Sequence, residues 1–224
     1  MTNDPALELQ KLILSELESA DSNARAEFLK NFAGETAEFV KYTAIALQSW
    51  TILHDAIPEG DDRRRPVVAI LFTAINFHTS SFKLFLSGHT TASGALFRQV
   101  LEAVSMALLC SAKGLDVLDR FLNDKYSTTD VVKRLARKHK QANVKPEAVN
   151  VLKDAYNFYH KYAHLTKLTI ATGANFQMGG APNVGGFFDL AKLPEYTKEV
   201  NGRVSFARVL PNIVDAVAHN MSTW

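Results

Sequence analysis

The stretch Val67-Val-Ala-Ile-Leu-Phe-Thr-Ala-Ile-Asn-Phe-His-Thr-Ser-Ser-Phe-Lys-Leu-Phe-Leu86 decides the fold of this chain. It is the most apolar run in the sequence, and Asn76, His78 and Lys83 interrupt it. Polar and charged side chains inside a run of this length are costly in a bilayer. We therefore predict a helix at the centre of a soluble protein rather than a membrane span. A helix that is apolar on most sides must be covered by other helices, which favours a helical bundle.

The rest of the chain up to residue 166 also predicts helices, which turn and capping residues separate. Apolar residues at helical spacing predict helices over 6–17, 22–54, 92–112, 115–124, 128–141 and 146–164. Asp61 or Asp62 is placed to cap the apolar helix, and Pro146 stands at the first position of the helix that ends at 164. The predicted fold class is therefore all-α, a bundle of six or more helices.

The segment after residue 166 departs from this pattern. Residues 173–186 (GANFQMGGAPNVGG) hold five of the 11 glycines and no charge, which predicts an irregular loop or lid. Asn201-Gly202 predicts either a hairpin turn or the end of a short helix at Val200, and a helix then follows over 206–222 despite Pro211. We expect a single domain over 1–224, made of acidic N-terminal helices (1–62), a central bundle (63–166), a Gly-rich excursion (167–202) and a C-terminal helix (203–224).

Charge is distributed unevenly along the chain, although the formal net charge is only +2. Residues 1–62 hold 12 Asp and Glu against 4 Lys and Arg, a balance of −8, whereas residues 63–224 hold 11 against 21, a balance of +10. This split indicates self-association through opposite faces, or an anionic ligand on the later part, or only the clustering of solvated faces.

The start of the chain, MTNDPALELQ, has no basic region followed by an apolar run, so it does not predict a secretory signal. The single Cys110 excludes an internal disulfide. We therefore expect a cytoplasmic protein with no membrane partner.

The segment Tyr156-Asn-Phe-Tyr-His-Lys-Tyr-Ala-His164 is the strongest candidate for a functional site. Its histidines, His160 and His164, are four residues apart and therefore share one face of a helix, a spacing that suits two metal ligands. A third ligand would have to come from another helix, and the candidates are Glu102, His89 and His78. Lys161 stands where a zinc-protease motif has its glutamate, so we predict no metal and no cofactor. The two histidines are then either acid–base groups or structural groups at the rim of the core.

A second polar group is the helical turn Arg98-Gln-Val-Leu-Glu102, which belongs to an otherwise apolar helix. Arg98 and Glu102 form a polar stripe on this helix, and if the stripe faces water, it is an ordinary solvated face. If it faces the helix over 146–164, its carboxylate would raise the pKa of a neighbouring imidazole and fix its tautomer, which suits acid–base work. The predicted catalytic set, beneath the loop at 173–186, is Arg98, Glu102, Tyr159, His160 and His164.

Basic residues on one short helix predict a nucleic-acid-binding face. The stretch from Val131 to Pro146 contains no acidic residue, and such a face contacts phosphate backbones, although a solvated helix has the same composition. The predicted binding residues are Lys133, Arg134, Arg137 and Lys138. The Gly-rich loop lacks the Gly-Lys-Ser/Thr ending of a phosphate-binding loop and does not follow a strand, so it predicts no nucleotide cofactor.

An Arg-x-x-x-Glu helix followed by a Tyr/His-rich helix that ends in Tyr-Ala-His164 resembles the HEPN superfamily, over about residues 67–166. The resemblance implies a small helical bundle, a homodimer, and metal-independent ribonuclease activity in bacterial defence or toxin–antitoxin systems. His164 stands at the family's histidine, but Asn157, Phe158 and Tyr159 occupy the positions where the family has its arginine.

The resemblance therefore implies RNA binding or RNA cleavage, with His164 as general acid or base and Arg98 as a substitute guanidinium. The alternative function is a non-catalytic helical scaffold or a small-ligand-binding protein. Whether the protein is an enzyme stays open at this point.

Overall fold

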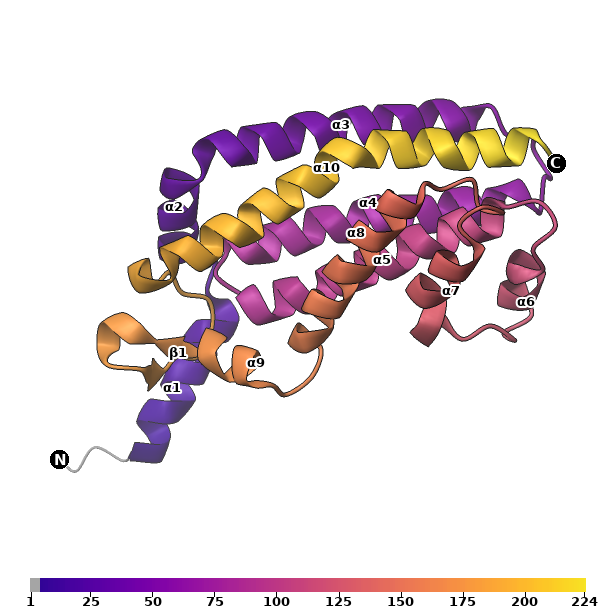
Figure 1. Ribbon diagram of the computed structural model, residues 1–224. Coiled ribbons are helices and arrows are strands. Elements are labelled where there is room, and N and C mark those ends of the chain that lie inside the picture. Colours follow the sequence, from indigo (N-terminus) through magenta and orange to yellow (C-terminus); the bar gives the residue numbers. More distant parts are fainter. Residues whose placement is uncertain (1–4) are drawn as a thin grey trace.

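The computed structural model describes residues 5–224 and confirms the all-α fold class; residues 1–4 of the expected acidic segment lie outside this range. The long helices α3 (Ala33–Asp55), α4 (Arg64–Leu86), α5 (Thr90–Ser111) and α10 (Leu193–Ser222) pack against one another as a bundle (Figure 1). The shorter helices are α1 (Pro5–Glu18), α2 (Ser22–Asn31), α6 (Val117–Leu122), α7 (Val131–Lys138), α8 (Pro146–Tyr159) and α9 (Lys167–Thr172). Single 3-10 turns are η1 (Thr128–Asp130), η2 (His160–Tyr162), η3 (Phe176–Met178) and η4 (Leu190–Lys192).

The apolar run forms α4, as predicted, and it pairs closely with α5. Asp61 caps α4, because its Oδ1 accepts a hydrogen bond of 2.8 Å from the backbone N–H of Arg64. Ser81 of α4 and Ser93 of α5 each donate a hydroxyl hydrogen bond to the other's backbone carbonyl, at 2.8 and 2.7 Å. These reciprocal bonds satisfy two buried hydroxyls and hold the two helices close together.

Helices α4 and α5 are both long and apolar enough to cross a membrane by length and composition. In the most apolar 18-residue stretch of each helix, 44% of the stretch in α4 and 67% of the stretch in α5 is buried inside the molecule. The core helices of soluble proteins can be equally long and apolar, so the length and composition of α4 and α5 are weak evidence for a membrane location.

Helix α10 differs from the prediction, because it begins at Leu193 and runs without a break through Asn201-Gly202 and Pro211. Neither the hairpin turn at Asn201-Gly202 nor a helix end at Val200 forms. The residues that override this local turn signal are buried at helical spacing: Val200, Val204, Ala207, Leu210 and Val214. Burying such a stripe is worth more than the cost of one glycine and one proline in a helix, which is about 1 and 3 kcal/mol.

The helix predicted over 22–54 is divided into α2 and α3 at Phe32. Phe28, Phe32 and Phe39 belong to an aromatic cluster with Phe82 and Phe85 of α4. Phe39 and Phe82 stack with their ring centroids 4.0 Å apart. These three rings are spaced four and seven residues apart and would also share one face of a continuous helix, so their packing does not by itself account for the break.

Of the Gly-rich excursion predicted over 167–202, only residues 173–192 lie outside α-helices, because 167–172 form α9 and 193–202 belong to α10. This irregular part contains a small antiparallel hairpin of β1 (Ala174–Asn175) and β2 (Ala181–Pro182). The turn between the strands uses Gly179 and Gly180, whose φ angles of 70° and 84° suit residues without a Cβ. Buried Asp189 fixes the excursion to the start of α10, because its carboxylate accepts backbone N–H bonds from Phe176 at 2.7 Å and Ala191 at 3.0 Å.

Candidate functional site

The two histidines of the Tyr156–His164 segment lie side by side on the surface at the end of α8. Helix α8 ends at Tyr159, and η2 carries the chain through His160 to Tyr162. The ring centroids of His160 and His164 are 4.4 Å apart, and both side chains are exposed. Desolvation, the positive charge of Arg98 and the neighbouring His164, in that order, lower the pKa of His160. A neutral imidazole next to a second imidazole can accept one proton while the other donates one.

Arg98 and Glu102 lie beside the histidine pair but bind each other. The ion pair from Arg98 Nη2 to Glu102 Oε1 is 2.9 Å long, and these side chains are only 18% and 17% exposed. The guanidinium lies over the ring of Tyr156, 5.4 Å from its centroid, and this ring is 5.9 Å from that of His160. The polar stripe therefore faces α8 rather than water, yet no hydrogen bond among the described residues joins it to His160 or His164.

Tyr159 belongs to a different group of side chains from the histidines. It is buried, whereas His160 and His164 are exposed, because successive residues of a helix point about 100° apart. Its hydroxyl donates a hydrogen bond of 2.9 Å to Oε2 of Glu199 on α10. The structure thus keeps Arg98, Glu102, His160 and His164 together and removes Tyr159 from the set.

Glu199 and Arg203 form a charged pair that the sequence did not predict, in which Arg203 is buried and Glu199 is partly buried. Arg203 is 0% exposed, and its Nη1 binds Oε2 of Glu199 while its Nη2 donates to Oγ of Ser93 at 2.7 Å. The other carboxylate oxygen, Oε1, accepts a hydrogen bond of 3.0 Å from the hydroxyl of Tyr162. We name Tyr159, Tyr162, Glu199 and Arg203 the glutamate cluster.

The electrostatics of the glutamate cluster keep its hydroxyls as donors. Burial and the neighbouring carboxylate raise the pKa values of Tyr159 and Tyr162, so both hydroxyls hold their protons at any ordinary pH. Burial alone would lower the pKa of the Arg203 guanidinium, but its neighbours Tyr159 and Glu199 outweigh burial and raise it. Glu199 and Arg203 are four residues apart, a spacing that predicts an ion pair on a helix. The turn predicted at Asn201-Gly202 lies between them, so the sequence did not predict that both belong to one helix.

The basic residues of α7 do not form one free stripe. Lys133 pairs with Asp130 at 2.9 Å, and the guanidinium of Arg134 lies 4.7 Å from the ring centroid of Tyr126. Arg137 and Lys138 line a hollow of about 320 Å³ next to α6, together with Arg120, Arg134 and Asp116. Lys133 is near enough to His160 to lower its pKa, which links α7 to the histidine pair.

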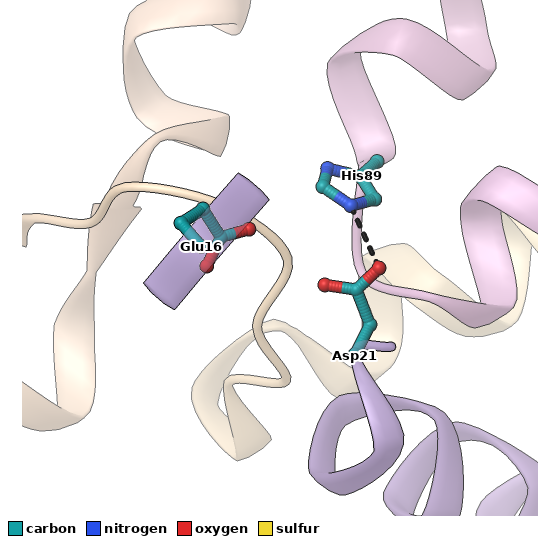
Figure 2. A group of neighbouring side chains, drawn as sticks. All are labelled: Glu16, Asp21 and His89. Atoms are coloured by element: carbon teal, nitrogen blue, oxygen red, sulfur yellow. Dashed lines mark hydrogen bonds and ion pairs between the residues drawn. The ribbon is translucent and has the colours of Figure 1, made fainter. Parts of the chain in front are cut away.

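Of the metal ligands considered for the histidine pair, Glu102 lies beside it but pairs with Arg98, whereas His78 and His89 lie elsewhere. His78 is fully buried among phenylalanine rings. His89 lies next to Glu16 and Asp21, and these three residues, all within the described range 5–224, offer ligand atoms within 4.8 Å of one another (Figure 2).

In the Glu16–Asp21–His89 group, His89 Nε2 and Asp21 Oδ2 form a hydrogen bond of 3.0 Å, shown by the dashed line in Figure 2. Gly185 and Gly186 pack against the group, and a side chain at Gly185 would overlap the Glu16 carboxylate. The group therefore joins α1, the α1–α2 turn, the start of α5 and the Gly-rich excursion. The loop at 173–186 thus contacts this end of the molecule, rather than covering the histidine pair as predicted.

No family model, curated protein or solved structure matches this chain. Assignment of function therefore depends on the geometry and chemistry of the two groups described above, the surface histidine pair and the buried glutamate cluster.

Proposed function

We propose that this chain is a HEPN-like protein that binds single-stranded RNA and cleaves it at the surface of His160 and His164. The observation that carries the proposal is the pair of exposed imidazoles 4.4 Å apart, one of which, His160, has its pKa lowered by desolvation and by the charge of Arg98. Cleavage of RNA without a metal needs one group that takes a proton from a ribose 2′-hydroxyl and another that gives a proton to the leaving oxygen. Two adjacent histidines with unequal surroundings supply both.

In this proposal His160 is the general base, because its lowered pKa keeps it neutral at pH 7, and His164 is the general acid. The phosphate would meet positive charge from Arg98 and Lys133, which already act on His160 electrostatically. Because Arg98 is paired with Glu102, its role is to supply a positive charge in a fixed position, which Glu102 partly compensates, rather than a free fork of donors.

The proposal includes a cytoplasmic homodimer. Exposed apolar residues flank the histidines, with Phe158 41% and Leu165 88% exposed. The described part of α1 also carries exposed apolar residues, among them Leu12, Ile13 and Leu17. Exposed apolar patches of this kind mark protein–protein contacts, and a second copy is the partner that the HEPN resemblance implies.

The test is incubation of the purified protein with labelled single-stranded RNA in the presence of EDTA, followed on a denaturing gel. We expect cleavage by the wild type, and a loss of about 100-fold or more in His160→Ala and in His164→Ala. His219→Ala removes an exposed histidine on α10 and serves as the matched control. Lys133→Ala should weaken RNA binding at low salt and lessen its salt dependence.

The absence of RNA binding at micromolar protein in low salt would overturn the proposal. Equal cleavage by wild type, His160→Ala and His164→Ala would assign the activity to a contaminant or to another site. Binding without cleavage in the wild type would retain the RNA partner and remove the catalytic role of the histidines.

A further inference from the structure

A pocket of about 510 Å³ opens between α8, α9, the Gly-rich excursion and the first turns of α10. Its walls are mainly apolar, and the aromatic members are Phe158, Tyr162, Phe176 and Tyr196. The volume is typical of a small-molecule site, as is the combination of apolar walls with a few polar groups. Glu199 lies on the wall of this pocket, so the glutamate cluster borders it.

The glutamate cluster presents its carboxylate to the pocket in a fixed orientation. The hydroxyls of Tyr159 and Tyr162 and the guanidinium of Arg203 hold the Glu199 carboxylate, whose side chain is 11% exposed. A buried ion pair gives little net stability, because desolvation offsets the attraction. Function is a better reason for three donors to converge on one carboxylate at the edge of a pocket.

The carboxylate keeps acceptor capacity for a ligand. An ionised carboxylate offers about four lone-pair positions. Oε2 of Glu199 accepts from both Tyr159 and Arg203, whereas Oε1 accepts only from Tyr162 among the hydrogen bonds of the described residues. Oε1 can therefore accept a further N–H bond from a group inside the pocket.

The other charged groups of the pocket balance one another. The ammonium of Lys192 already donates to the carbonyls of Thr172 at 3.0 Å and Ala174 at 2.6 Å. Glu195 and Lys198 are exposed at the pocket, and no ion pair in the described part of the chain involves either of them. Because these two free charges have opposite signs, the pocket suits a ligand without net charge.

We propose that this pocket binds a nucleobase, with guanine as the best match. A planar heterocycle can stack on the aromatic walls, which Tyr162 and Phe176 provide. Guanine places two neighbouring donors, N1–H and the N2 amino group, on its Watson–Crick edge; one can bond the open acceptor position of Oε1, and the other faces the negative carboxylate without repulsion. Adenine and cytosine offer an acceptor beside their single amino donor, and uracil has an acceptor on each side of its N–H. The carboxylate of Glu199 therefore discriminates in favour of guanine.

The base can come from a free nucleoside or from single-stranded RNA with an unstacked guanine. In the RNA case the inference depends on the proposed function, whereas in the free-nucleoside case it does not. Two arms of one experiment separate these sources.

In the first arm, guanosine, adenosine, cytidine and uridine are titrated separately into the full-length protein by calorimetry. We expect guanosine to bind at least tenfold more tightly than the other three nucleosides. Ala171→Trp places a large ring in the pocket from an exposed position of α9 and should weaken guanosine binding at least tenfold. Ala26→Trp, at an exposed position of α2, is the matched control and should bind like the wild type. Glu199→Gln should abolish the preference for guanosine, and Ala171→Trp retains the test if that variant does not fold.

In the second arm, single-stranded RNA with and without guanine is bound to the wild type and to Ala171→Trp. Loss of the guanine preference in Ala171→Trp supports a base of RNA as the natural occupant. Guanosine binding without RNA binding supports a free nucleoside and removes the proposed function. RNA binding that ignores both guanine and Ala171→Trp leaves the proposed function standing; it assigns the pocket to a free nucleoside if guanosine binds in the first arm, and removes the pocket inference if guanosine does not bind. Failure of guanosine to bind the wild type at about 1 mM, or equal binding of all four nucleosides, overturns the inference.

Discussion

The replacement of His78 by leucine should make the protein more stable, and increasingly so as the pH falls. His78 is 0% exposed on α4, and phenylalanine rings surround it: the ring centroids of Phe39, Phe206 and Phe97 lie 4.7, 5.1 and 5.3 Å away. Neither ring nitrogen has a hydrogen-bond partner among the described residues. A buried polar group without a partner costs about 1–3 kcal/mol, so a leucine of similar volume removes that cost.

The pH dependence follows from the pKa of this imidazole. Burial first, and the charge of Arg203 second, lower the pKa of His78 from 6.5 to about 3. Below pH 6.5 the unfolded chain takes up a proton at this residue, whereas the folded protein does not, so the free energy of unfolding falls as the pH falls toward 3. At about 1.4 kcal/mol per pH unit, the wild type loses roughly 2.7 kcal/mol between pH 8 and pH 4.5 through this one group.

The assay is urea unfolding of wild type and His78→Leu at pH 8, 6.5, 5.5 and 4.5, in which the difference between the two proteins cancels all other titrations. We expect His78→Leu to be more stable at pH 8, and its advantage to grow by roughly 2.7 kcal/mol at pH 4.5. The exposed His219→Gln is the control, and its difference from the wild type should change by less than about 0.5 kcal/mol. A difference between wild type and His78→Leu that stays constant with pH would refute the reasoning, because His78 would then be protonated equally in both states.

Three further outcomes are expected from other parts of the core. Gly94→Ala should destabilise the protein by about 1–3 kcal/mol, because the new Cβ would overlap a buried tyrosine ring, whereas Gly34→Ala meets nothing within 4 Å and should change thermal stability little. Arg203→Met should cost about 3–5 kcal/mol in urea unfolding, because it leaves Glu199 without its buried partner, and the double variant with Glu199→Leu should recover most of this loss. If the double variant were no more stable than the single one, the ion pair would not be the cause. Cys110, whose thiol pKa burial raises to about 12, should resist alkylation at pH 8 in the native state and react in urea; rapid alkylation of the folded protein would contradict its burial.

Local sequence patterns determined much of this protein. The apolar run from Val67 to Leu86 predicts α4 because the length and apolar composition of a helix are properties of that segment alone. Two histidines four residues apart lie side by side because adjacent helical turns bring them there, and they stay together even though η2 replaces the last turn of α8. The Gly-rich composition likewise predicts the irregular excursion, since glycine favours positive φ and disfavours helix.

Only the tertiary structure decided the rest, because those features depend on contacts between distant segments. Asn201-Gly202 has the local preference of a turn, yet α10 passes through it, since the buried stripe of α10 packs against α3, α4 and α5. That helix brings Glu199 and Arg203 to Tyr159, across 40 and 44 residues of sequence. The direction of Arg98 toward Tyr156 is likewise set by packing between helices, which no periodicity within one segment specifies.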